Sequence, residues 1–173
     1  MQFEFTLLRF MRRLTGNRYG DIVMPHITRL GDYGILWIAI ALILLCFGKT
    51  RRAAWTMLVS LLIESIFCNG ILKPLVNRSR PFEIAKDIHP LITPPKDRSF
   101  PSGHTGSSIA AVVALYLAKS HLWKALLPFA VLISWSRLYI CVHFVTDILG
   151  GIGAGILSAC AGHVAVKWFE NKK

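Results

Sequence analysis

The chain has 173 residues, of which 54% are hydrophobic, and it carries 20 Lys and Arg against 9 Asp and Glu, a formal net charge of +11. A mean hydropathy of +0.51 excludes a disordered basic tail and argues against a soluble nucleic-acid-binding protein, because both keep their cations on a polar chain. An integral membrane protein fits both numbers, since its cations gather in short loops beside the bilayer. The length suits a single domain over residues 1–173.

The N-terminal segment, residues 1–30, predicts an amphipathic helix that lies in the membrane interface. It mixes apolar side chains such as Phe3 and Phe10 with arginines such as Arg9 and Arg12, a pattern typical of interfacial helices. No cleaved leader is expected, because these arginines follow the first leucines and do not precede a long apolar core.

Continuous apolar runs follow, and they predict an all-α, polytopic membrane bundle of about five transmembrane helices. Several runs are shorter than the ~20 residues that a span requires, so they must extend into flanking residues. In the last run, Gly151 and Gly155 have the spacing that lets transmembrane helices approach closely. The runs are residues 33–48, 53–72, 105–118, 123–136 and 144–168.

One long polar connection, residues 73–104, separates the second and third runs. Its six prolines and mixed charges predict a shaped loop without helix. Each span reverses the direction of the chain, so this loop, the end of the fourth run and the start of the fifth all lie on one side of the membrane. Residues 73–104 are therefore predicted to form an active-site loop.

Basic side chains collect on that side and predict an anionic ligand. Lys73 and Arg80 begin the loop and Arg137 ends the fourth run; Arg supplies bidentate geometry for phosphate oxygens and Lys a compact charge. Taken singly, such residues are also common as headgroup anchors, and Arg78 is interpreted as headgroup-facing or structural. Together they favour a site for phosphate.

Two histidines provide candidate chemistry at the same interface. Ser102, Gly103 and His104 begin a helix, where a serine cap and free amides suit a phosphate and the histidine can donate a proton. His143 and Asp147 are four residues apart, on one helical face, and a carboxylate that holds one imidazole nitrogen leaves the other free to act as a base or nucleophile. A plain capped helix, a structural His–Asp pair and a proton relay are the alternatives.

Phosphoryl transfer uses all of these parts, because it chiefly requires positioning and charge neutralisation. No metal ion and no other cofactor is expected: the three nearby cations would repel a divalent ion, and the four cysteines show no ligand spacing.

The ordered motifs Lys73-x6-Arg80-Pro81, Pro101-Ser102-Gly103-His104 and Ser136-Arg137-x5-His143-x3-Asp147 resemble the three-part signature of the type 2 phosphatidic acid phosphatase superfamily. The resemblance implies a metal-independent phosphatase with a helical core and a phosphohistidine on His143. It implies that Asp147 orients His143 and that His104 is the acid. The implied phosphate ligands are Lys73, Arg80, Ser102, Gly103 and Arg137.

The compact size resembles bacterial members that act on undecaprenyl diphosphate, and phosphatidylglycerophosphate or phosphatidate is the alternative substrate. Soluble haloperoxidases share the signature and use vanadate, but the long apolar runs argue against that branch. The expected partners are a lipid phosphate and the bilayer, with no nucleic acid. The expected location is a bacterial plasma membrane with the site on the external or periplasmic side, because the short basic loop 49–52 is typical of the cytoplasmic side.

Two functions of other classes remain as alternatives. A proton-coupled transporter would use His143, Asp147 and Glu64 as a relay, although an interhelical hydrogen bond is the expected role of Glu64. A binding protein without catalysis is the third hypothesis, and it ranks below the others because no residue of the signature is missing.

Overall fold

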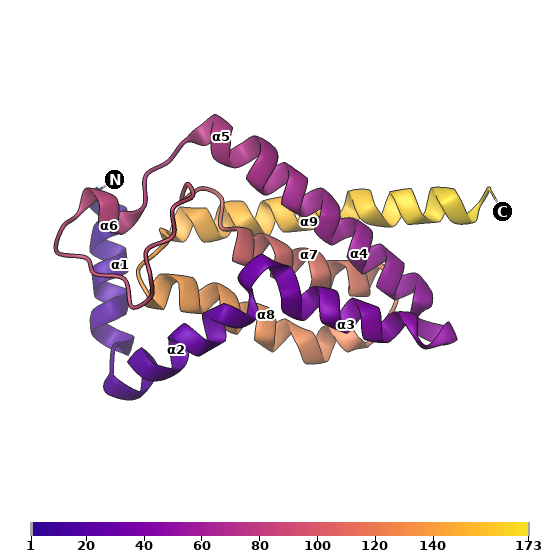
Figure 1. Cartoon of the computed structure of the whole chain (residues 1–173), viewed down its shortest axis with the longest axis horizontal. Helices are drawn as coiled ribbons and strands as arrows, with labels where there is room; N and C mark the ends of the chain where they lie inside the picture. The colour runs from indigo at the N-terminus through magenta and orange to yellow at the C-terminus, as the bar shows by residue number, and fades with distance from the viewer. Residues whose placement is uncertain (1, 173) are drawn as a thin grey trace.

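The computed structural model describes residues 2–172, and within them the regular structure is helical (Figure 1). Labels α and η mark α-helices and shorter or wider helical turns. In chain order the elements are α1 (Gln2–Thr15), α2 (Arg18–Leu30), η1 (Asp32–Gly34), α3 (Ile35–Leu45), η2 (Gly48–Thr50), α4 (Arg51–Ser65), η3 (Ile66–Leu72), α5 (Lys73–Val76), α6 (Pro81–Ile84), α7 (Gly103–Leu117), α8 (Leu122–Tyr139) and α9 (Val145–Glu170).

The core of the bundle is built by α4, α7 and α9, which pack against one another. Glycines on α9 make this packing close: a Cβ at Gly151 would lie 2.6 Å from the carbonyl oxygen of Ser102, and one at Gly155 would lie 2.5 Å from that of Gly106. The predicted close approach at the two α9 glycines is thereby confirmed. Since α7 carries the Ser102–His104 motif at its start, the packing fixes that motif against α9.

Two helical stretches, Gly48–Ile84 and Val145–Glu170, are long and apolar enough to cross a membrane. A third candidate is the pair α2 and α3, which bend by 44° at their junction. Residues 33–48 were expected to form the first span, but the helix in this run, α3, has only 11 residues and is too short to cross a membrane alone. The helix breaks there at Tyr33 and Gly34, whose φ angles of 53° and 69° are left-handed, so α2 must supply the rest of any crossing.

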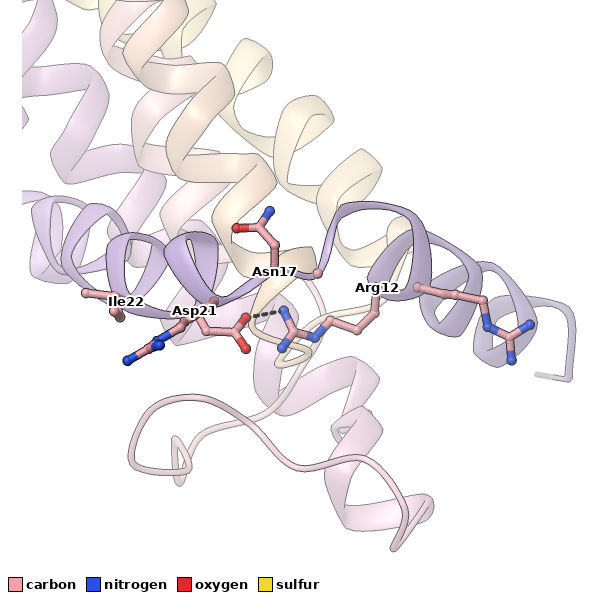
Figure 2. Close-up of a pocket in the computed structure, with 7 residues that line it drawn as sticks. Arg12, Asn17, Asp21 and Ile22 are labelled. Carbon is pink, nitrogen blue, oxygen red and sulfur yellow. Dashed lines mark ion pairs between the residues drawn. The ribbon is translucent and has the colours of Figure 1, made fainter.

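The N-terminal segment forms two helices joined at Gly16 and Asn17, where one was expected. Asn17 caps α2 by accepting a hydrogen bond from the amide of Gly20 (2.8 Å). Figure 2 shows the junction, where Arg12 pairs with Asp21 (2.7 Å). α1 lies crosswise at the end of the bundle opposite the C-terminus (Figure 1).

The polar connection begins later than expected, since helix continues through Lys73 and Pro74 to Val76 before the chain leaves it at Asn77. A short helix, α6, interrupts the remaining loop. That loop lies at the same end of the bundle as α1 (Figure 1).

Candidate active site

A cavity of about 1020 Å³ opens where α5, α7 and α8 meet the loops that follow α5 and α8. The polar loop, the end of α8 and the residues before α9 meet at this cavity. Their meeting is consistent with the prediction that successive spans reverse the direction of the chain. Ser102 and Asp147, which are fully buried, support the wall from behind. The predicted site residues that line the cavity are Lys73, Arg80, Gly103, His104, Arg137 and His143.

Three cations lie in this wall and are almost inaccessible to solvent: Lys73 is 9% exposed, Arg80 2% and Arg137 3%. Within residues 2–172 the Nε of Arg137 has no hydrogen-bond partner. A buried guanidinium donor without an acceptor is costly, so an anion in the cavity would supply what Arg137 lacks. The geometry is that of an anion cradle.

Asp97, from the loop, already faces two of these cations. Its Oδ2 pairs with Lys73 Nζ and its Oδ1 accepts from Arg80 Nη2 at 2.8 Å. Burial alone would raise the pKa of Asp97, but the two cations outweigh burial and hold the pKa well below its ordinary value. A carboxylate of the chain therefore neutralises part of the cradle.

His143 presents one imidazole nitrogen to the cradle. Arg80 Nη1 lies 3.3 Å from Nε2, and because a guanidinium only donates, Nε2 is the unprotonated nitrogen. Nδ1 then carries the proton and lies 3.4 Å from Asp147 Oδ2. Burial lowers the pKa of His143, the nearby arginines lower it further, and Asp147 opposes them, so the neutral ring is favoured.

Asp147 is held from several directions. Its Oδ2 accepts hydrogen bonds from Ser99 Oγ (2.5 Å) and from the Phe144 amide (2.8 Å). Its Oδ1 accepts from Arg78 Nη1 at 2.7 Å, and Arg78 in turn pairs with Glu4 on α1. The interpretation of Arg78 as structural agrees with these contacts, and through them α1 supports the back of the site.

The start of α7 forms as the sequence predicts, with Ser102 as its cap. Ser102 Oγ accepts from the amide of Thr105 at 3.4 Å, and its own amide donates to the carbonyl oxygen of Asp147 at 3.0 Å. Gly103 lines the cavity, and a Cβ there would meet the side chains of Asn69 and Lys73 at 3.7 Å. The first turn of α7 is thus directed at the cavity.

His104 follows Gly103 in the first turn of α7 and has an acidic partner. Its Nε2 is 2.9 Å from Asp32 Oδ1 and 3.4 Å from Arg137 Nη1. Arg137 is held in turn by Thr28, whose Oγ1 accepts from Nη1 at 2.5 Å. The imidazole is therefore placed between a carboxylate and a guanidinium.

The cavity continues from these polar groups onto apolar side chains of α3 and α4, namely Ile38, Leu58, Leu61 and Leu62. Charged groups at one end and aliphatic groups at the other suit a ligand that is itself charged at one end and apolar at the other.

Glu64 also lines the cavity and is only 3% exposed. It lies where α4 meets α7, and a Cβ on Gly106 would fall 2.1 Å from its Oε1. Within the described residues Oε1 has no hydrogen-bond partner, so the expected interhelical hydrogen bond is not found at this oxygen.

Four residues of the site were not predicted from the sequence: Thr28, Asp32, Asp97 and Ser99. Asp97 and Ser99 lie within the four residues before the Pro101–His104 motif, and that position was the available signal. Asp32 stands between Gly31 and Gly34 just before an apolar run, where a charged residue at a helix break marks an interface. For Thr28 the sequence holds no signal.

Comparisons with known proteins identify the family of the chain. Residues 53–171 match the model of the PAP2 superfamily. An undecaprenyl-diphosphatase of Sulfolobus acidocaldarius is 34% identical over 125 residues, which cover 70% of this chain and 60% of that protein. Phosphatidylglycerophosphatase B of Bacillus subtilis is 34% identical over 172 residues, which cover 87% of this chain and 75% of that protein.

Among solved structures, Aquifex aeolicus LpxE superposes with a TM-score of 0.80 and 25% identity, covering 91% of this chain and 93% of that one. The chain spans 60% of the length of the archaeal relative. Because the family model covers well over half of its residues, the chain belongs to the PAP2 superfamily.

Proposed function

We propose that the protein is an integral-membrane lipid phosphatase that works through a phosphohistidine on His143. One observation carries the proposal: Nε2 of His143 lies 3.3 Å from Nη1 of Arg80, within a cavity that Lys73 and Arg137 also line. A nucleophile beside buried cations is the arrangement that phosphoryl transfer requires.

In the first step, Nε2 of His143 attacks phosphorus and the bond from phosphorus to the leaving oxygen breaks. Lys73, Arg80 and Arg137 neutralise the charge on the phosphoryl oxygens, and the amide of Gly103 adds a hydrogen bond. The amide of Ser102 already donates to Asp147, so Ser102 acts by capping the helix that presents Gly103. The leaving oxygen takes a proton from His104. Asp147 stabilises the charge that develops on the ring of His143.

In the second step, water attacks the phosphohistidine and His104 takes the proton that it gave up in the first. The bond from phosphorus to Nε2 breaks, and orthophosphate leaves. His143 returns to its neutral form with its proton on Nδ1, beside Asp147. The cycle ends with every proton in its original place and requires no metal ion or other cofactor.

A lipid substrate is favoured by the apolar wall, since Ile38, Leu58 and Leu61 offer a place for a hydrocarbon chain while the phosphate reaches the cradle. Relatives are named undecaprenyl-diphosphatase and phosphatidylglycerophosphatase B. We favour undecaprenyl diphosphate as substrate, with phosphatidylglycerophosphate or phosphatidate as the second choice.

A panel of substrates tests this function. Full-length protein in detergent is given undecaprenyl diphosphate, phosphatidylglycerophosphate, phosphatidate or glucose 6-phosphate, and phosphate release is measured with excess EDTA. We expect release from at least one lipid, none after His143→Ala and little change after His89→Ala, a loop variant. Turnover of the sugar phosphate equal to that of the lipids would contradict the lipid assignment, and loss of activity with EDTA would contradict metal-free chemistry.

The proposed topology has five crossings, by α2 with α3, by α4 with η3 and α5, and by α7, α8 and α9, in a single domain over residues 1–173. The site would face the external or periplasmic side of a bacterial plasma membrane, since the basic turn at Lys49 lies at the other end of α4. In a background free of native cysteines, Lys96→Cys should react with an impermeant thiol reagent on whole cells and Lys49→Cys should not. The reverse pattern would place the site on the cytoplasmic side.

A further inference from the structure

Asp32 lies at the break between α2 and α3, and the geometry of this break directs it at the start of α7. Tyr33 and Gly34 adopt left-handed φ angles of 53° and 69°, which turn the chain sharply after Asp32. Asp32 Oδ1 then reaches His104 Nε2 at 2.9 Å. Since an ionised carboxylate only accepts hydrogen bonds and lies nearer to Nε2 than Arg137 does, we assign the proton to Nε2.

The neighbouring residue shapes the same contact. A Cβ at Gly31 would lie 2.7 Å from Cδ2 of the His104 ring and 2.8 Å from Ile133, so the imidazole rests against bare backbone. The segment Gly31–Asp32 therefore forms both the wall and the hydrogen-bond partner of this ring. Helix α2 also supplies Thr28, which holds Arg137 beside it.

Charged groups face His104 from three elements. Arg137 on α8 lies 3.4 Å from Nε2, Lys73 on α5 lines the same cavity, and Asp32 on η1 contacts the ring. Burial and the two cations oppose a positive charge on the imidazole, and the carboxylate offsets part of that effect. A proton donor must carry its proton when the substrate binds, so Asp32 is the one group in contact with the ring that favours the donor form.

We propose that Asp32 is a positioning residue for the proton donor: its contact with Nε2 fixes the orientation of the His104 ring in the cavity and favours the ring's protonated form, so that expulsion of a poor leaving group depends on it. The inference rests on the proposed role of His104. As the bond from phosphorus to the leaving oxygen breaks, the Nε2 proton passes to that oxygen. Asp32 and His104 both line the cavity, so a leaving oxygen can approach Nε2 beside the carboxylate.

Two substrates that carry the same dodecyl group distinguish this role from a structural one. Dodecyl phosphate must expel an alkoxide, which needs the proton, whereas dodecyl diphosphate expels a phosphate monoester whose second pKa is about 6 and which needs it little. We expect Asp32→Asn to lower kcat/KM for dodecyl phosphate by about 10–100-fold and for dodecyl diphosphate by less than about 3-fold. Asp32→Glu should restore part of the loss.

The pH profile gives a second readout with either substrate. Without the carboxylate the imidazolium loses its proton more readily, so the basic limb of kcat/KM should move to lower pH in Asp32→Asn. Asp21→Asn is the matched control, because it removes an ion-paired carboxylate on α2, outside the cavity. It should leave the basic limb of kcat/KM unchanged, and also the ratio of kcat/KM for the two dodecyl substrates.

Several outcomes would overturn the inference. If Asp32→Asn lowers kcat/KM equally for both substrates and leaves the basic limb in place, Asp32 has a structural role. If it lowers kcat/KM for neither substrate, Asp32 does not position His104. His104→Asn separates the two proposals: if it lowers kcat/KM more for dodecyl phosphate while Asp32→Asn does not, the inference about Asp32 fails alone. If His104→Asn affects both substrates equally, the proposed proton donor itself is wrong. Thermal unfolding of each variant identifies losses caused by misfolding.

Discussion

His143 Nδ1 lies 3.4 Å from Asp147 Oδ2, with both side chains almost completely buried. The carboxylate is fixed by Ser99, Phe144 and Arg78, so the ring has little freedom to rotate. This relationship keeps the proton on Nδ1 and directs Nε2 toward Arg80. The proposed nucleophile is therefore oriented before any substrate binds.

Asp147→Asn should lower kcat by about 10²-fold or more, because an amide can present its NH₂ group to Nδ1 and favour the wrong tautomer. The KM should change little, since Asp147 does not line the cavity. Steady-state phosphate release measures both constants. Loss of binding with an unchanged kcat would show that Asp147 acts on substrate affinity.

The acid limb of kcat/KM should lie below pH ~6.5, the ordinary value for histidine. Burial, then Arg80 and Arg137, lower the pKa of His143 against the opposing effect of Asp147, so the ring stays neutral in mildly acidic solution. The same shift makes the unfolded chain bind a proton that the native site does not, so the free energy of unfolding should fall as pH drops below ~6.5. A limb above that value would contradict the assigned environment of His143.

Asp97→Asn should tighten the binding of orthophosphate as a competitive inhibitor. Asp97 occupies the cations that phosphate must reach, and since its side chain is 50% exposed, each pair contributes little, so the Ki should fall by only about 3–10-fold. Asp87 is another carboxylate of the same loop and forms an exposed ion pair with Arg9 on α1. Asp87→Asn should leave the Ki unchanged. A higher Ki in Asp97→Asn would mean that Asp97 positions the cations and does not compete with phosphate.

Gly155→Ala should destabilise the bundle by about 1–3 kcal/mol, because the added Cβ would lie 2.5 Å from the carbonyl oxygen of Gly106. Gly153→Ala is the matched control on the same helix, since its Cβ would meet no described atom within 4 Å. Thermal unfolding in detergent measures the difference. Equal midpoints would show that α7 and α9 can separate without cost.

The sequence predicted the membrane class, the convergence of the motifs and the cap at Ser102, because these follow from hydropathy and from the alternating direction of successive spans. It did not predict the short α3, since the break depends on left-handed backbone at Tyr33 and Gly34. Nor did it predict Asp32 and Asp97 as partners of His104 and Lys73. Such pairings depend on the path of irregular segments, which has no periodic signal.

Direct capture of the intermediate on His143 is the decisive measurement. Full-length protein is mixed with ³²P-labelled undecaprenyl diphosphate or phosphatidylglycerophosphate, quenched within the first turnover in alkali, where phosphohistidine survives, and digested for mass spectrometry. We expect the label on His143, its loss in His143→Ala and its retention in His89→Ala. Turnover at full rate in His143→Ala, or label on another residue, would contradict the mechanism.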